Sequence, residues 1–437
     1  MTAPAGAKAN VPPVALPLGF LLAGGIGLVT FGGAILFHAH TAVAAPQNPD
    51  TIAVVHFGVL TFLSTAVLGA LHQFGPVVGQ RRLRSVAAAW ATLATMVTAT
   101  WLLPVGFAHG PKSLVIAAAL VGAVAVCLAA WNLSGPLSGR DGGVPVAGLR
   151  LSVAYLVGTV TFGVVYAFDR QSGWFVLLGH RVLAHAHLGL LGWLGLTYMA
   201  VAEKLWPMFL LAHRPRARSG AWAVALVATG TAILATGLLF AQSVVTGLGA
   251  AIVIGGVVAH LTSLAGAVKH RRRSLELLHA FLFASATFLV TAVVVGILAA
   301  LAPVGTVVRG HLVSAEVASL IAWLGLAVIG HSHKIVPFIS YARLRERGVQ
   351  THSSGRPLLF GDLFNARWAV VAFVLATAGF AAVVVGIIAG ASPVVAAGGA
   401  AVAAAGAVAT VNLAIGPRLA MRASAGQSET PLLETTT

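Results

Sequence analysis

The chain has 437 residues, of which 58% are apolar and 8% are charged, and its formal net charge is +16. Soluble domains carry about 25% charged residues, so the composition excludes an ordinary soluble protein and indicates an integral membrane protein. Binding to nucleic acid is excluded as well, because the basic residues separate apolar runs and do not form one patch.

Apolar runs long enough to cross a bilayer, about 20 residues each, follow one another along the chain. The sequence therefore predicts an all-α membrane protein with twelve transmembrane helices in one membrane domain, residues 1–423. The polar residues 424–437 are expected to form a disordered cytoplasmic tail. The predicted spans are approximately 14–38, 52–77, 84–107, 113–133, 148–168, 182–210, 220–243, 245–268, 276–302, 312–339, 367–391 and 393–416.

Basic side chains concentrate in every second connection between these spans, as Arg81, Arg82 and Arg84 illustrate after the second span. Because loops rich in lysine and arginine stay in the cytoplasm, both termini are predicted to be cytoplasmic, with the protein in the plasma (inner) membrane. The other connections contain few basic residues, namely Lys112, Arg170, Arg181 and Arg309.

The second, sixth and tenth spans share a pattern that ends in proline. His56 lies 20 residues before Pro76, and His187 lies 20 residues before Pro207. A polar dipeptide also precedes each proline: His72-Gln73 before Pro76, Glu203-Lys204 before Pro207 and His333-Lys334 before Pro337. The pattern predicts three pseudo-repeated four-helix units, approximately 14–133, 148–268 and 276–416. The alternative explanation is that prolines often end helices near a polar interface.

Ionisable side chains within the spans fall into two layers. Such groups are costly in a bilayer and are functional candidates by default. Toward the outer end lie His38, His40, His56, His180, His185, His187 and Glu316. Toward the inner end lie His72, Glu203, Lys204, His279, His331, His333 and Lys334.

His185 and His187 are two residues apart, which on an α-helix is a rotation of about 200°. We therefore expect them to point to opposite sides of the helix and to serve two different pockets. His56 and His187 share their position before the proline, which favours a ligand role for both.

Two further groups have both a functional and a structural interpretation. His38, His40 and His180 are candidate ligands of a second site for copper or another transition metal, or else side chains wetted at the interface. The inner set His72, Glu203, His279, His331 and His333 is a candidate proton relay, quinone head-group site or metal site. The structural alternative for the inner set is interfacial anchoring, with Lys204 and Lys334 reaching toward the headgroups.

The run His185-Ala-His187-Leu-Gly-Leu-Leu-Gly-Trp193-Leu-Gly195, followed by Pro207, resembles the ligand helix of the catalytic subunit of haem-copper oxidases. The similarity is greatest to the C-family oxidases and the nitric oxide reductases. It is dense over about 23 residues and elsewhere extends only to the twelve-helix plan.

The resemblance implies that His187 and His56 are axial ligands of a low-spin haem and that His185 faces a second haem or metal pocket. It implies one or two haem b groups, with copper or another transition metal as a further cofactor. The implied activity is electron transfer or an oxidoreductase chemistry of nitric oxide or oxygen. The implied partners besides membrane lipid are an electron-donor subunit, a cytochrome or quinol.

Two features depart from the family pattern. The family carries this signature on its tenth helix, whereas here it lies on the sixth, and the seventh span contains no histidine pair for copper. Two other functions therefore stay open: a membrane transporter or metal-handling protein, and a haem-based nitric oxide response or sensor protein without turnover.

Overall fold

The structure is a computed structural model that describes residues 12–139, 142–212, 218–351 and 356–419. Within these ranges the regular elements are all helices, and one isolated bridge joins Thr351 and Pro357. In the described part of the chain, twelve helices are long and apolar enough to span a membrane, which confirms the predicted all-α fold with twelve candidate spans. The predicted tail 424–437 lies outside the described residues.

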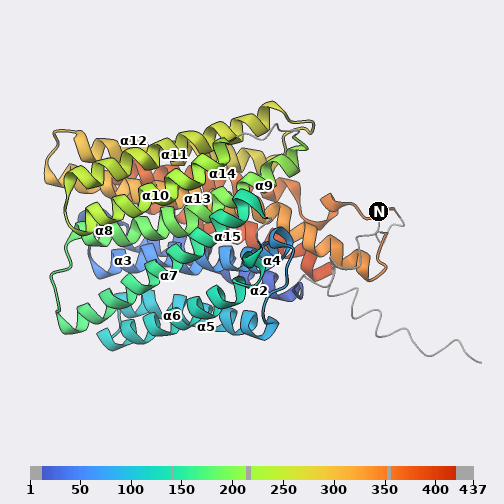
Figure 1. The fold of residues 1–437 in the computed structure, drawn as a ribbon, viewed down its shortest axis with the longest axis horizontal. Helices are drawn as coiled ribbons and strands as arrows, with labels where there is room; N and C mark the ends of the chain where they lie inside the picture. The colour runs from blue at the N-terminus through green and yellow to red at the C-terminus, as the bar shows by residue number, and fades with distance from the viewer. Residues whose placement is uncertain (1–11, 140–141, 213–217, 352–355, 420–437) are drawn as a thin grey trace, which may run out of the picture.

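The helices run side by side along one axis of the molecule (Figure 1). Two of the spans combine three elements each, with a π-helical segment in the middle. The elements are α2 (Ala15–Ala44), α3 (Pro49–His56), η1 (Phe57–Ser64), α4 (Thr65–Gly79), α5 (Val86–Ala108), α6 (Lys112–Leu133), η2 (Pro136–Ser138), α7 (Gly143–Ser172), α8 (Gly179–His187), η3 (Leu188–Gly195), α9 (Leu196–Leu210), α10 (Ser219–Leu239), α11 (Ser243–Lys269), α12 (Leu277–Leu301), α13 (Thr306–Glu346), η4 (Phe360–Leu363), α14 (Ala366–Ile388) and α15 (Ser392–Leu413).

The largest departures from the predicted limits occur in α2 and α13. Helix α13 continues to Glu346, well past the end of its apolar run, and α2 continues to Ala44 with a kink at His38. Hydropathy locates only the part of a helix that lies in hydrocarbon, and a polar turn can extend beyond the bilayer.

Three spans lie at the centre of the bundle: α3–η1–α4, α8–η3–α9 and α13. In their most apolar windows 61%, 67% and 67% of the residues are buried, whereas no other span exceeds 50%. These central helices are the ones that carry the proline-terminated histidine pattern. Costly polar side chains are thereby enclosed by protein and kept from lipid.

The central helices contact one another at matching positions. Trp193 Nε1 donates a hydrogen bond to Ser64 Oγ at 3.1 Å. A methyl group added at Gly195 would lie 3.1 Å from the Trp323 ring, and one added at Gly325 would lie 3.4 Å from the Phe62 ring. Each contact joins a residue twelve positions before the proline of one helix with a residue fourteen positions before the proline of the next: Ser64 with Trp193, Gly195 with Trp323, and Gly325 with Phe62.

The two π-helical segments begin directly after the two histidines that share a sequence position. Segment η1 follows His56 and segment η3 follows His187, and each has eight residues. A π-helical turn inside an α-helix is rare and frequently marks a functional site. Because the π-helix widens the turn, it shifts the rotational phase of the residues on either side of it.

Close packing in the sixth span makes Gly192 sensitive to substitution. A β-carbon at this position would lie 2.3 Å from the Tyr155 ring, whereas one at Gly158 would meet nothing within 4 Å. We expect Gly192→Val to destabilise the fold by about 1–3 kcal/mol through overpacking and Gly158→Val to cost much less. Size-exclusion chromatography after graded heating measures both. Equal loss of the monodisperse species in the two variants would contradict the packing argument.

Candidate cofactor site

A cavity of about 700 Å³ lies within the bundle, lined by residues from the first to sixth spans and from α13, α14 and α15. This volume falls within the range of ordinary small-molecule and cofactor sites, about 300–1,000 Å³. Most of its lining is aliphatic or aromatic. The nitrogen-bearing side chains on the lining belong to His56, His185, Trp193, Gln47 and Arg309.

His56 is the last residue of α3 and lines the cavity. Its Nδ1 lies 2.7 Å from the backbone oxygen of Ile52, one turn earlier in the same helix. Because a carbonyl oxygen can only accept, Nδ1 carries the proton in this bond and Nε2 retains its lone pair. A histidine held through Nδ1 in this way is a typical metal ligand through Nε2. The Phe107 ring, 5.2 Å away between centroids, packs beside it.

His185 faces the same cavity from α8. Its ring centroid lies 6.5 Å from that of His56, with 25° between the ring planes. The Nδ1 atom of His185 is buried and has no hydrogen-bond partner among the described residues. A buried polar atom without a partner is uncommon and requires an explanation, such as a bound group.

The separation of the two rings can be compared with that of two imidazoles bound to opposite sides of one metal ion. Nitrogen–metal bonds are about 2.0–2.1 Å, and the centre of an imidazole ring lies about 1.1 Å from its nitrogen, so the centroids would be about 6.3 Å apart. The observed 6.5 Å is close to this value. His56 and His185 therefore border the same part of the cavity at a separation similar to that of two imidazoles bound to one metal ion.

His187 points away from this cavity. Its Nδ1 contacts the backbone oxygen of Leu183 at 2.8 Å, and its Nε2 lies 3.2 Å from Glu316 Oε1. The side chain is 7% exposed, and the Glu316 side chain is 20% exposed. Both nitrogens of His187 are thus in use.

His185 lines the cavity, whereas His187 lies against Glu316, so the two side chains point in different directions as expected. The pairing of His56 with His187 as haem ligands stays a prediction. The partner of His56 across the cavity is His185. Similarity at matching positions in two helices does not fix which ring faces which, because the angle at which each helix presents its side chains depends on packing. His187 instead contacts Glu316 of α13, a residue that does not belong to the repeated pattern.

Several glycines lie on the cavity wall at positions where side chains of neighbouring elements pack closely against them. Gly122, Gly163 and Gly189 all line it, and a β-carbon at Gly163 would lie 3.4 Å from Cε1 of His185. Trp193 closes the inner side and is held by its bond to Ser64. At the outer end Arg309 donates to the backbone oxygens of Ala299 and Ala302.

The three outer histidines expected as a metal site do not meet. His38 Nδ1 lies 3.9 Å from Asp50 Oδ2, and His180 Nδ1 contacts the backbone oxygen of Leu238 at 2.8 Å. His40 is exposed. Among the described residues no group of three or more histidine, cysteine, aspartate or glutamate side chains is arranged to hold a metal ion. The sequence alone did not indicate that the His180 side chain lies against α10.

The inner-layer residues His72, Glu203 and His333 occupy matching positions but also do not form one cluster. His72 stacks on Phe20 of α2 with 5.4 Å between centroids, and His333 stacks on Phe281 of α12 at 5.6 Å. Glu203 accepts a 2.5 Å hydrogen bond from Ser263 of α11. Each side chain therefore packs against a different outer helix, as expected when three related helices present the same face outward.

The remaining inner residues lie near α12. His279 Nδ1 accepts from the backbone N–H of Glu276 at 2.9 Å, and Lys334 Nζ lies 2.5 Å from Glu276 Oε2. His331 packs against Tyr198, with 6.1 Å between ring centroids. These contacts make a small polar network at the inner end of α12 and α13, where His331 and His333 point to different neighbours.

His260 is a buried residue that the sequence patterns did not bring forward. It is 1% exposed on α11, its ring lies 5.6 Å from that of Tyr198, and neither ring nitrogen has a hydrogen-bond partner among the described residues. The sequence feature that could have pointed to His260 is its position as an isolated histidine inside an apolar span. It was not selected because it has no counterpart in the repeated pattern of the central helices. Its neighbours Tyr198 and His331 come from two of the central helices.

The Glu276–Lys334 pair predicts a dependence of stability on pH. Burial opposes ionisation of Glu276, but the hydrogen bond and charge of Lys334, with the charge of Arg273, outweigh it and hold the pKa of Glu276 below its ordinary value. The carboxylate therefore adds stability that is fully present above the unfolded-state pKa of about 4.3 and is lost as the pH falls through the lower folded-state pKa.

We expect the thermal unfolding temperature of the protein to exceed that of Glu276→Gln by a constant amount from about pH 6 to 8. The difference should shrink between about pH 5 and 3. Differential scanning fluorimetry in detergent measures this, and a difference that grows on acidification would contradict it.

Comparison with known proteins adds no assignment to this geometry, because the chain matches no protein-family model and no curated protein.

Proposed function

We propose that this protein is a haem-binding integral membrane protein that transfers electrons, with His56 and His185 as the axial ligands of one haem. The observation that carries the proposal is the pair of histidines that share one apolar cavity with 6.5 Å between their ring centroids. The sequence of the sixth span and the twelve-helix plan resemble the catalytic subunit of haem-copper oxidases, although that resemblance would place His187, and not His185, opposite His56.

The residues present fit a haem for three reasons. A macrocycle supplies four of the six iron ligands, so the protein needs only two, and His56 and His185 are two. The walls are mostly apolar, which suits the macrocycle. Arg309 is the one permanently charged side chain on the described lining, and it suits the propionate groups of a haem b.

A haem supplies one-electron chemistry at a potential that its axial ligands and burial set. With both axial positions taken by histidine, its iron would have no open position for oxygen or nitric oxide. Electron transfer therefore fits this pair better than turnover of either gas. The electron donor would be a quinol or a cytochrome.

We extend the proposal to the architecture: three four-helix units around a pseudo-threefold axis, with both termini cytoplasmic. The cyclic contacts of the central helices support the three units. So do two spacings that recur in the first and third units. His72 and His333 each stack on a phenylalanine 52 residues earlier. Asn132 and Asn412 each bond both backbone groups of a residue 47 positions earlier, Ser85 and Asn365.

The orientation rests on the distribution of basic residues between the two ends of the bundle. Reaction of single introduced cysteines with a membrane-impermeant thiol reagent, in a background lacking Cys127, tests it.

An absorption spectrum of the purified protein, oxidised and reduced, tests the haem proposal. Expression with added haem precursor and pyridine-haemochrome quantification accompany it. A reduced spectrum with a sharp α-band and about one haem b per chain is the expected result. A colourless, monodisperse protein would reject the proposal and favour the transporter alternative.

A further inference from the structure

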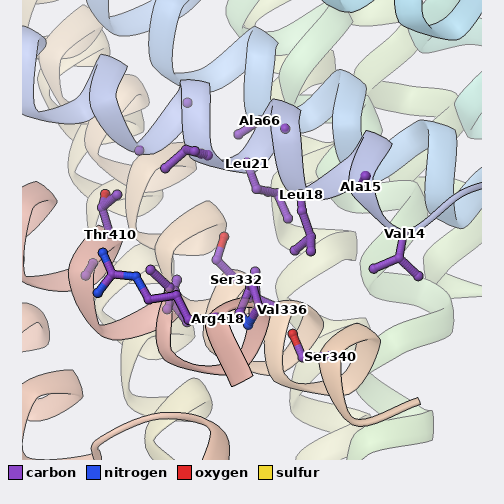
Figure 2. A pocket seen from close by; sticks show the side chains of 18 of the residues that line it. Val14, Ala15, Leu18, Leu21, Ala66, Ser332, Val336, Ser340, Thr410 and Arg418 are labelled. Carbon is purple, nitrogen blue, oxygen red and sulfur yellow. The ribbon is translucent and has the colours of Figure 1, made fainter. Parts of the chain in front are cut away.

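A second cavity lies at the end of the bundle where α2 begins and α13 ends. Its volume is about 710 Å³, and α2, α13 and α15 form its walls (Figure 2). Leu18 and Leu21 of α2 face Ser332 and Val336 of α13 across it, and Thr410 lies on the α15 side. No residue that lines this cleft also lines the cavity of the candidate haem site.

The cleft is long, apolar and open toward one end. From Val14 to Leu28 the α2 wall is about 21 Å long at the α-helical rise, compared with about 15 Å of hydrocarbon in one bilayer leaflet. Leucine, isoleucine, valine, alanine and glycine make up most of the lining. These dimensions suit an extended alkyl chain lying parallel to the helices.

The mouth of the cleft is basic. Arg343, Arg347 and Arg418 line it, and no acidic residue is among the described lining residues. Arg343 pairs with Glu346 at 3.4 Å, with both side chains more than 40% exposed, so this bond is weak and open to exchange. Arg418 is exposed, has no ion-pair partner among the described residues and extends on the same side as Thr410 (Figure 2).

A buried polar atom lies between the basic mouth and the apolar depth. Ser340 is fully buried, and its hydroxyl lines the cleft without a hydrogen-bond partner among the described residues. It is one helical turn before Arg343. This is the depth at which the ester carbonyls of a phospholipid lie below a phosphate held by the arginines.

We propose that this cleft binds one anionic phospholipid. Its phosphate lies among Arg343, Arg347 and Arg418, an ester oxygen accepts from Ser340, and an acyl chain lies between α2 and α13. Arginine is suited to phosphate because its planar group donates two parallel hydrogen bonds, and basic pockets between helices bind anionic headgroups. This inference does not depend on the haem proposal.

Native mass spectrometry of the full-length protein in detergent tests the inference. The probes are dipalmitoyl phosphatidylglycerol and dipalmitoyl phosphatidylcholine, which have the same acyl chains and differ in the headgroup, anionic in the first and zwitterionic in the second. We expect one phosphatidylglycerol to bind about tenfold more tightly than phosphatidylcholine. The variant Arg343→Gln/Arg418→Gln should lose about tenfold in phosphatidylglycerol affinity. The control Arg271→Gln/Arg272→Gln removes two exposed arginines from the same end of the bundle, outside the cleft, and should change affinity by less than about twofold.

Binding of the acyl chain between the helices is tested by a separate pair of variants. Leu18→Trp and Leu22→Trp both add bulk to the wall of the cleft, and we expect either variant, if monodisperse, to reduce phosphatidylglycerol binding without changing haem content. Equal binding of the two lipids, or equal loss in the two arginine pairs, would overturn the inference. Displacement of the lipid by millimolar inorganic phosphate would assign the mouth to free phosphate and overturn it too.

Discussion

Replacing His185 by alanine should abolish haem binding, and so should His56→Ala. Each histidine would supply one of the two bonds from the protein, and Met96 is the one other side chain on the described lining that could bind the iron. The haem content should fall from about one per chain to below about a tenth, measured by pyridine haemochrome on protein of verified monodispersity.

The control for this experiment is His187→Gln, since glutamine can still donate to Glu316 but is a poor haem ligand. It should keep its haem and its reduced α-band. His185→Met provides a second check, because methionine restores an axial ligand and raises the potential. Loss of haem in His187→Gln with retention in His185→Ala would reverse the assignment and restore the pairing of His56 with His187.

Breaking the His187–Glu316 pair should destabilise the bundle more when histidine is removed than when glutamate is removed. His187→Leu leaves a carboxylate inside a membrane span without its 3.2 Å partner, and we expect a loss of about 2–3 kcal/mol. Glu316→Leu leaves a histidine that can stay neutral, so its cost should be smaller. Thermal unfolding in detergent, followed by the loss of the monodisperse peak, ranks the variants.

The double variant His187→Leu/Glu316→Leu separates a true pair from two independent packing effects. If the pair is coupled, the double variant should be more stable than the sum of the single losses predicts, because neither polar group is then left alone. Simple additivity would show that the contact between His187 and Glu316 contributes nothing of its own.

Sequence patterns distinguished the helices that lie at the centre of the bundle. The shared spacing before Pro76, Pro207 and Pro337 identified the three spans that are most buried in the structure. The same alignment places Phe62, Trp193 and Trp323 at one position, fourteen residues before each proline, where the helices meet. That match was readable in advance, since Trp-Leu-Gly-Leu occurs at both Trp193 and Trp323.

The candidate site could be predicted only in part. His56 and His185 both stood out as ionisable groups in spans, and both line the cavity. Their direct pairing was missed because His187, which matches His56 in position, lies against Glu316. The π-helical segments η1 and η3 rotate the directions of the side chains that follow His56 and His187. No feature of the amino-acid composition predicted these segments.

The amino-acid sequence by itself determined that this is a membrane protein with twelve spanning helices and which of them carry ionisable groups. The physical reason is that hydrocarbon requires every backbone polar group to be bonded within its own segment, so each long apolar run must be a helix. Only the tertiary structure decided which side chains face one another: His185 across the cavity from His56, His187 against Glu316, and His260 beside Tyr198. Those partners depend on the rotation of each helix about its own axis, which is fixed by packing against neighbours that are distant in the sequence.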